Sequence, residues 1–201
     1  CGTTAVVTVP PQTPSDAPVE TPAVPASTPA EGAGGSVKTG LSLVTSVGSS
    51  ASASAGGDGL AQADITLIAV TVGEDGVIDA CAIDAIQSKV NFDASGQMLS
   101  DLTVPVRSKN ELGTDYGMAV ASSIGKEWNE QAQALADYVV GKTIDQVTGI
   151  AVTEDGKAAD ADLAASVTMS IGGYLEGIRQ AVANAQYLGA SKGDALVLTS
   201  T

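Results

Sequence analysis

Residues 63–90 read ADITLIAVTVGEDGVIDACAIDAIQSKV, and this stretch decides the fold that we expect. Residues 63–72 are rich in β-branched side chains and apolar on both faces, which is typical of a central strand. The EDG at 74–76 is a turn signal, and residues 77–90 are expected to return as a long or bent strand. The stretch therefore predicts an antiparallel hairpin.

Flanking segments extend this hairpin into a small sheet. Residues 41–47 alternate enough to form a short strand, and residues 49–59 form a loop rich in Ser, Gly and Ala. A second turn is expected at 93–96, and Pro105 marks a loop or a sheet edge. Cys81 lies inside the returning strand, where we interpret it as a small buried apolar residue.

Helical spacing begins near Asp115 and is clearest over 128–140, with Gly141 as a natural C-cap. One more helical turn is expected at 143–147, and a C-terminal helix starts at 172–173. The apolar stripe of the first long helix is formed by Trp128, Ala132, Leu135 and Val139. Strands followed by helices predict an α+β fold, an antiparallel sheet with helices packed on one face.

The first 35 residues differ from the rest of the chain. They hold seven of the eight prolines and no Lys or Arg. Such a segment cannot collapse, so residues 1–35 are expected to form a disordered Pro-rich stalk, leaving 36–201 as a single domain. No stretch of the chain is apolar over the length that spans a bilayer.

The sequence opens with Cys1-Gly2, followed by the Pro- and Thr-rich stretch. It resembles a mature bacterial lipoprotein, in which a signal peptide has been removed before an acylated cysteine. This resemblance implies a lipid on Cys1 that anchors the protein to the membrane, and an extracytoplasmic location at the cell surface.

The composition excludes several classes of function. The net charge is −14, which would repel a phosphate backbone, so nucleic-acid binding is not expected. The chain has no histidine, which removes imidazole as a general base and as a metal ligand. The paired carboxylates lie in turn-like, solvated segments, which do not favour a general acid. We expect no catalytic residues and no metal site, and the sequence favours a binding protein over an enzyme.

Residues 162–168 read DLAASVT and precede the C-terminal helix. This segment resembles the flavin attachment segment, Asp-x-x-Ser/Thr-Gly/Ser-Ala-Thr, of the FMN-binding domain family of exported electron-transfer proteins. Asp162, Ser166 and Thr168 occupy matching places. The resemblance implies an FMN cofactor attached as a phosphate ester at Thr168, and a redox partner protein.

Two positions depart from that pattern, Ala165 in place of a hydroxyl residue and Val167 in place of Ala. Without the resemblance, the segment is a turn in which Ser166, Thr168 or Ser170 caps the following helix. A phosphate would be favoured at that helix N-terminus in either case.

Residues 109–118 form a second candidate segment, in which polar groups and glycines surround Tyr116 and Met118, with Trp128 following. Such mixtures line small-molecule pockets, where a flavin ring or a sugar would stack on Tyr116 or Trp128. The alternative is a helix cap with Trp128 as core filler. Two functions remain open: a cell-surface flavin protein for electron transfer, or a cofactor-free ligand-binding or interaction module.

Overall fold

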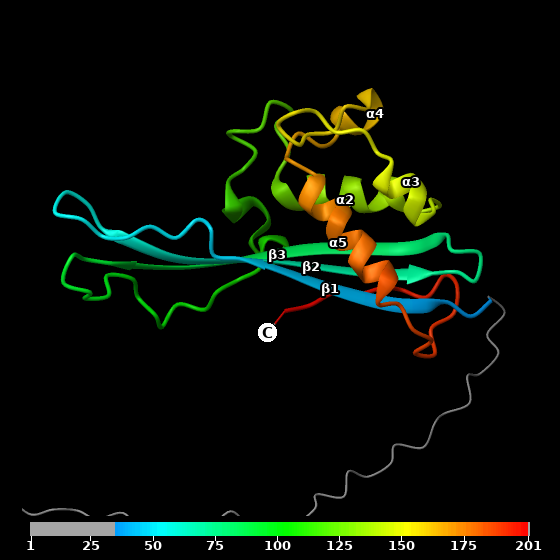
Figure 1. Ribbon diagram of the computed structural model, residues 1–201, viewed down its shortest axis with the longest axis horizontal. Helices are drawn as coiled ribbons and strands as arrows, with labels where there is room; N and C mark the ends of the chain where they lie inside the picture. The colour runs from blue at the N-terminus through cyan, green and yellow to red at the C-terminus, as the bar shows by residue number, and fades with distance from the viewer. Residues whose placement is uncertain (1–34, 201) are drawn as a thin grey trace, which may run out of the picture.

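The computed structural model describes residues 35–200 (Figure 1). Its sheet contains three strands, β1 (Lys38–Ser46), β2 (Gly59–Val72) and β3 (Ile78–Phe92), in the spatial order β1-β2-β3. Both strand pairs are antiparallel, so the predicted hairpin and the central position of β2 are confirmed. The lipid on Cys1 and all of the expected stalk, residues 1–35, except Gly35 lie outside the described part of the chain.

The helices follow the sheet in the sequence. They are α1 (Lys109–Leu112), the 3-10 helix η1 (Gly113–Tyr116), α2 (Trp128–Val139), α3 (Ile144–Thr148), α4 (Ala161–Ala164) and α5 (Gly172–Ala183). The expected α+β class and the helices α2, α3 and α5 are confirmed. None of the described helices is both long enough and apolar enough to cross a bilayer.

The prediction that helical structure runs on from Asp115 is wrong. Asp115 belongs to the short η1, and the chain forms turns from there to the start of α2. Gly117 and Gly125 adopt the left-handed backbone conformation, with φ of +75° and +65°, which interrupts any α-helix at these points. The resulting loop packs over the N-terminal end of α2, next to the candidate site.

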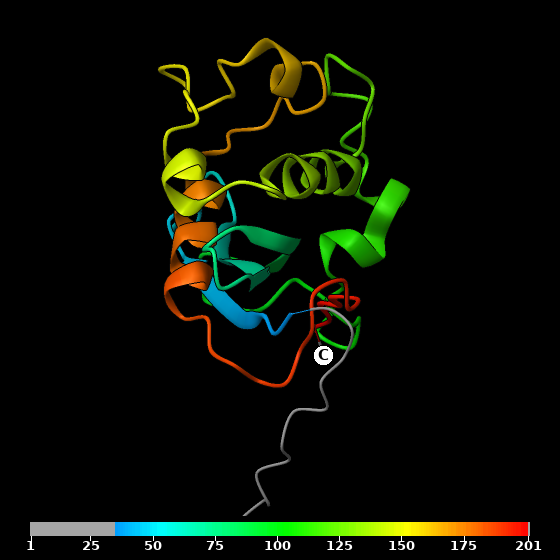
Figure 2. The same ribbon diagram turned by 90° about the vertical axis from the view of Figure 1, so that its right-hand side faces the viewer.

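The core lies between one face of the sheet and the helices. The stripe of α2 is buried as predicted, with Trp128 at 2% exposure and Leu135 and Val139 fully buried. It packs with the apolar face of α5 over Ile68 and Val70 of the central strand. Figures 1 and 2 show α2 and α5 on the same side of the sheet, where apolar burial provides most of the stabilising free energy.

The opposite face of the sheet is covered by the chain that follows α5. Gln186 exchanges two backbone hydrogen bonds with Thr39, of 2.8 and 3.0 Å, at the outer edge of β1. The Gly193 N–H then donates to Asp79 on β3, at 3.0 Å, and Ser200 lies beside Ile86. This irregular segment explains why Leu67 and Ala69, which face away from the helices, are also buried.

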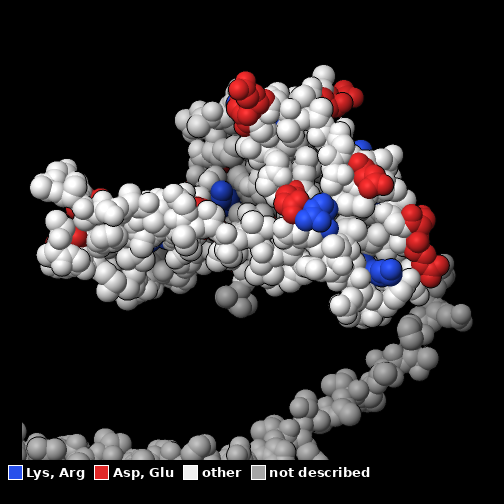
Figure 3. Space-filling view, viewed as in Figure 1, with Lys and Arg blue, Asp and Glu red and all other residues white. Residues whose placement is uncertain are grey.

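Strands β2 and β3 continue beyond the end of β1 and, with the loops at their outer ends, form an arm that we call the hairpin arm, comprising residues 47–63 and 88–107 (Figure 1). Figure 3 shows that this arm carries few charged side chains on the face in view. Its returning segment exposes a row of large apolar side chains, namely Met98, Leu99, Leu102, Val104 and Val106.

Candidate functional site

Thr168 lies in the irregular segment between α4 and α5, where it is half-buried. Its backbone N–H and its hydroxyl both donate to Oε1 of Gln131, over 2.8 and 3.2 Å. The Met169 N–H donates to the same oxygen over 3.3 Å. Val167 is 1% exposed in the core, so its branched side chain does not stand between Thr168 and the surface.

Gln131 connects three parts of the chain although it is fully buried. Besides accepting from the Thr168 segment, its Nε2 donates to the Ser122 hydroxyl over 3.2 Å and to the Lys126 carbonyl over 3.1 Å. A buried amide is stable only when its donors and acceptors are paired, as here. Gln131 thereby fixes Thr168 and the loop before α2 against one helix.

Trp128 precedes Gln131 by about one helical turn, so the two side chains lie on the same side of α2. Its indole N–H donates to the Tyr174 hydroxyl over 3.3 Å, and the two ring centres are 6.3 Å apart. Tyr174 belongs to the first turn of α5. Burial raises the pKa of Tyr174, although the hydrogen bond from Trp128 acts in the opposite direction.

Lys109 completes an aromatic cluster around Trp128. Its Nζ lies 4.6 Å from the centre of the Tyr116 ring and 5.1 Å from the centre of the Trp128 ring, within the range of cation–π attraction. Lys109 is held there by α1, whose capping box joins Ser108 and Glu111 in two reciprocal hydrogen bonds. Only 9% of Lys109 is exposed.

Polar side chains of the sheet border this cluster. The Tyr116 hydroxyl donates to Oε1 of Gln87 over 3.5 Å, and the amide of Gln87 donates to Asp64 over 2.9 Å. Desolvation acts to raise the pKa of Asp64, but hydrogen bonds from Gln62, Gln87 and Ser49 lower it overall. The site is therefore the corner between the base of the hairpin arm, η1 and the N-terminal end of α2.

The structure brings together three of the five residues singled out from the sequence. Thr168 joins α2 through Gln131, and Tyr116 meets Trp128 around Lys109. Asp162 is exposed on α4 and Ser166 is half-buried. Within residues 35–200, neither of these two side chains forms a hydrogen bond to the cluster.

The alternative interpretation, in which Ser166, Thr168 or Ser170 caps α5, is wrong. The N-cap residue is Ile171, and no side chain caps this helix. The core-filler interpretation of Trp128 agrees with its 2% exposure. Tyr116, which is half-buried, is thus the more accessible aromatic surface of the cluster.

The sequence analysis missed Gln131 and gave no role to Lys109 by itself. A signal for Gln131 exists, because it lies between Trp128 and Leu135 on the buried side of α2, where an apolar residue would be expected. Lys109 carries no such signal, since lysine is almost always exposed unless its charge is paired.

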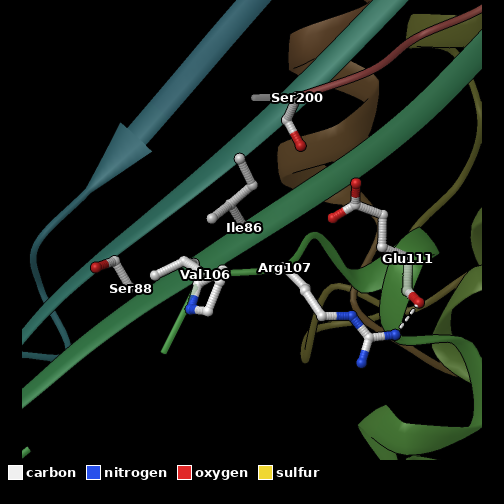
Figure 4. A pocket seen from close by; sticks show the side chains of 7 residues that line it. Ile86, Ser88, Val106, Arg107, Glu111 and Ser200 are labelled. Atoms are coloured by element: carbon white, nitrogen blue, oxygen red, sulfur yellow. Dashed lines mark hydrogen bonds between the residues drawn. The ribbon is translucent and has the colours of Figure 1, made fainter. Parts of the chain in front are cut away.

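Other features of the described residues are distinct from this cluster, although the first, a groove, borders α1. A groove of about 880 Å³ is lined by Ile86, Ser88, Arg107, Glu111 and Ser200, and Figure 4 shows how these side chains lie. Burial raises the pKa of Cys81 to about 12, with a further contribution from Asp137, so its thiol stays protonated. No group of three or more Cys, Asp or Glu within 35–200 is arranged to hold a metal ion.

Comparison of the chain with protein-family models, with curated proteins and with solved structures gives no match in any of the three.

Proposed function

We propose that this protein is a surface-anchored flavin carrier for extracytoplasmic electron transfer, with FMN esterified to Thr168. One observation supports this above others. The attachment-like segment and the aromatic segment are far apart in sequence, yet they meet on one face of α2, through Gln131 and Trp128. Covalent attachment of a flavin needs a hydroxyl acceptor, and an aromatic side chain in the same region can pack against the flavin ring.

The residues present fit the phosphate of FMN. The first-turn amides of α5 have no side-chain cap, and the free N–H groups of a helix N-terminus favour an anion. Thr168 precedes this helix by four residues, at the edge of the same corner.

The geometry at Thr168 suits an acceptor of a phosphoryl group. Its hydroxyl proton is donated to Gln131, which leaves the lone pairs of Oγ1 available. Esterification removes that proton and the 3.2 Å bond, but the 2.8 Å bond from the Thr168 N–H remains. Gln131 therefore positions the residue both before and after attachment. The flavin, when bound, would supply the electron transfer, and no side chain of the site needs to act as a proton donor.

The anchor belongs to the same proposal. The resemblance of the first residues to mature lipoproteins supports acylation of Cys1, and the Pro-rich stretch would lift the domain from the lipid surface. At a net charge of −14, adhesion to an anionic membrane by charge alone is unfavourable. Cys1→Ser should release the protein into the medium, and a variant that stays with the membrane fraction would contradict the anchor.

Attachment of the flavin is tested by producing the full chain together with a flavin transferase and examining the denatured protein by in-gel flavin fluorescence. The wild-type chain should fluoresce and Thr168→Ala should be dark. Thr148→Ala is the matched control, because Thr148 is an exposed threonine whose hydroxyl bonds only to carbonyls of its own helix. A dark wild-type chain, or a fluorescent Thr168→Ala, would refute the proposal.

A second candidate function, a cofactor-free interaction module, is favoured by the apolar row on the hairpin arm. An exposed apolar surface of this kind is typical of protein contacts. This function predicts that the chain stays colourless beside the transferase. It also predicts that cross-linking to surface proteins on intact cells is lost in Leu102→Asp and kept in Thr168→Ala.

A further inference from the structure

We propose that two copies of this chain associate through their hairpin arms, which lie side by side in opposite directions. The tip of each arm, where the strands end in loops, then contacts the base of the other, where the arm joins the body. This inference is independent of the flavin, because no residue of the cluster around Thr168 and Trp128 takes part. It identifies a second copy of the chain as the occupant of the apolar row.

The apolar row follows the arm from tip to base. Its five large side chains are each 49–64% exposed, namely Met98, Leu99, Leu102, Val104 and Val106. Met98 pairs with Phe92 at the outer end of β3, whereas Val106 lines the groove together with Ile86. Phe92 and Ile86 are six residues apart on one strand, so the row is about 20 Å long. Exposed apolar surface of this kind marks a contact with another molecule.

The two ends of the row have complementary shapes. At the base, Ile86, Pro105 and Val106 form the apolar wall of the groove of about 880 Å³ (Figure 4). At the tip, Met98 and Leu99 are exposed, and an unbranched methionine adapts to an irregular groove. A two-fold axis through the middle of the row brings the tip of each arm to the groove of the other copy.

The charges of the arm favour the same arrangement. Its three acidic residues lie in the outer half, namely Asp58, Asp93 and Asp101. The base carries Arg107, which donates two of its five N–H groups to Asp115 and to a carbonyl of α1. Three N–H groups of Arg107 are thus left for a carboxylate from another molecule. Arms in opposite directions set each acidic tip against Arg107 of the other copy, whereas parallel arms would set acid against acid.

The charge of the domain favours a second copy over a membrane as the occupant. Residues 35–200 carry 20 acidic and 9 basic side chains, a net charge of −11, and the arm, with three acidic and two basic, accounts for only −1 of it. Two copies therefore meet with least repulsion through their arms. Insertion of the tip into a bilayer would bring its three carboxylates to the lipid first, which an anionic surface and a hydrocarbon interior both oppose.

Sedimentation of the full chain with Cys1→Ser tests the association, because this change prevents an acyl group from joining the chains by itself. This parent chain should convert from monomer to dimer between about 1 μM and about 1 mM. Leu102→Asp places two carboxylates near the two-fold axis and should raise the dissociation constant at least about 100-fold. Leu188→Asp is the matched control, since Leu188 is an exposed leucine outside the arm, and it should change the constant less than about twofold.

Disulfide formation under a mild copper oxidant tests the direction of the arms. In the Cys1→Ser chain, Met98→Cys should cross-link with Val106→Cys when the two variants are mixed, because tip meets base, and neither variant should cross-link with itself. Cys81 stays out of this reaction, since burial keeps its thiol protonated.

Three results would overturn the inference. The first is a parent chain that stays monomeric up to about 1 mM, or one whose dimer is weakened equally by Leu102→Asp and Leu188→Asp. The second is a disulfide between two copies of Met98→Cys, which would show arms in the same direction. The third is a monomer that floats with vesicles of phosphatidylglycerol and phosphatidylethanolamine and loses this binding in Leu102→Asp, which would assign the row to a membrane. None of these results changes the test of flavin attachment at Thr168.

Discussion

Replacing Gln131 by alanine should destabilise the protein strongly, because this side chain is fully buried and connects three segments. The change removes five hydrogen bonds, of which we count the shortest to each segment, namely those to the Thr168 N–H at 2.8 Å, the Lys126 carbonyl at 3.1 Å and the Ser122 hydroxyl at 3.2 Å. Each is worth about 1 kcal/mol net, so we expect a loss of about 3 kcal/mol. For a domain of this size, that loss lowers the Tm by about 6–12 °C.

The assay is thermal and urea unfolding of the full chain, followed by far-UV circular dichroism. Gln133→Ala is the matched control, since Gln133 is exposed on the same helix and bonds only to Asp137 one turn later. It should cost less than about 0.5 kcal/mol. Gln131→Glu keeps the acceptor for Thr168 but sets a buried carboxylate oxygen against the Lys126 carbonyl, so at neutral pH it should destabilise at least as much as Gln131→Ala. A Gln131→Ala chain as stable as Gln133→Ala would refute the reasoning.

Three further predictions concern other parts of the molecule. Gly40→Ala should destabilise the protein by more than about 3 kcal/mol, because the added Cβ would lie 1.9 Å from a backbone carbonyl oxygen of α5. Gly173→Ala is the control, since its Cβ would have no atom within 4 Å, and it should leave the thermal stability unchanged or raise it in the same melts. In a chain with Cys1→Ser, Cys81 should react with a thiol reagent at pH 8 only after unfolding, because burial raises the pKa of its thiol to about 12. Rapid labelling of the native protein would contradict this. Hydrogen bonds from Arg179 and Gln180 lower the pKa of Glu176 to about 2, so the small contribution of the ionised Glu176 to stability should be lost as the pH falls from about 4.5 to about 2. An NMR titration should show a higher pKa for Glu176 in Arg179→Ala than in the wild type.

Much of the fold could be predicted from the sequence because local patterns determine it. The β-branched run of 63–72, the turn residues at 74–76 and the helical spacing of the apolar stripe of α2 are each a local signal for one kind of element. The start of helical structure was misplaced because two glycines between η1 and α2, Gly117 and Gly125, adopt the left-handed backbone conformation and interrupt a sequence whose spacing suggests a helix. The segment after α5 has no periodicity, so its path under the sheet depends on backbone bonds to the distant strand β1.

The candidate site was predictable in its parts but not in its assembly. Thr168 was singled out from a motif, and Tyr116 and Trp128 were singled out because Tyr and Trp are rare in this chain. Neither step needs knowledge of how the chain packs. Their meeting depends on Gln131 and on the burial of Lys109, and both are consequences of long-range contacts. A single sequence does not show which lysine packs against aromatic rings, because that depends on contacts between distant segments.

Mass spectrometry of one peptide tests the central claim most directly. Trypsin should release residues 158–179 from chain produced beside a flavin transferase, since Lys157 and Arg179 bound this stretch. The account predicts that the peptide carries the mass of FMN less one water, with fragment ions placing it on Thr168. An unmodified peptide, or a flavin on another residue, would contradict it.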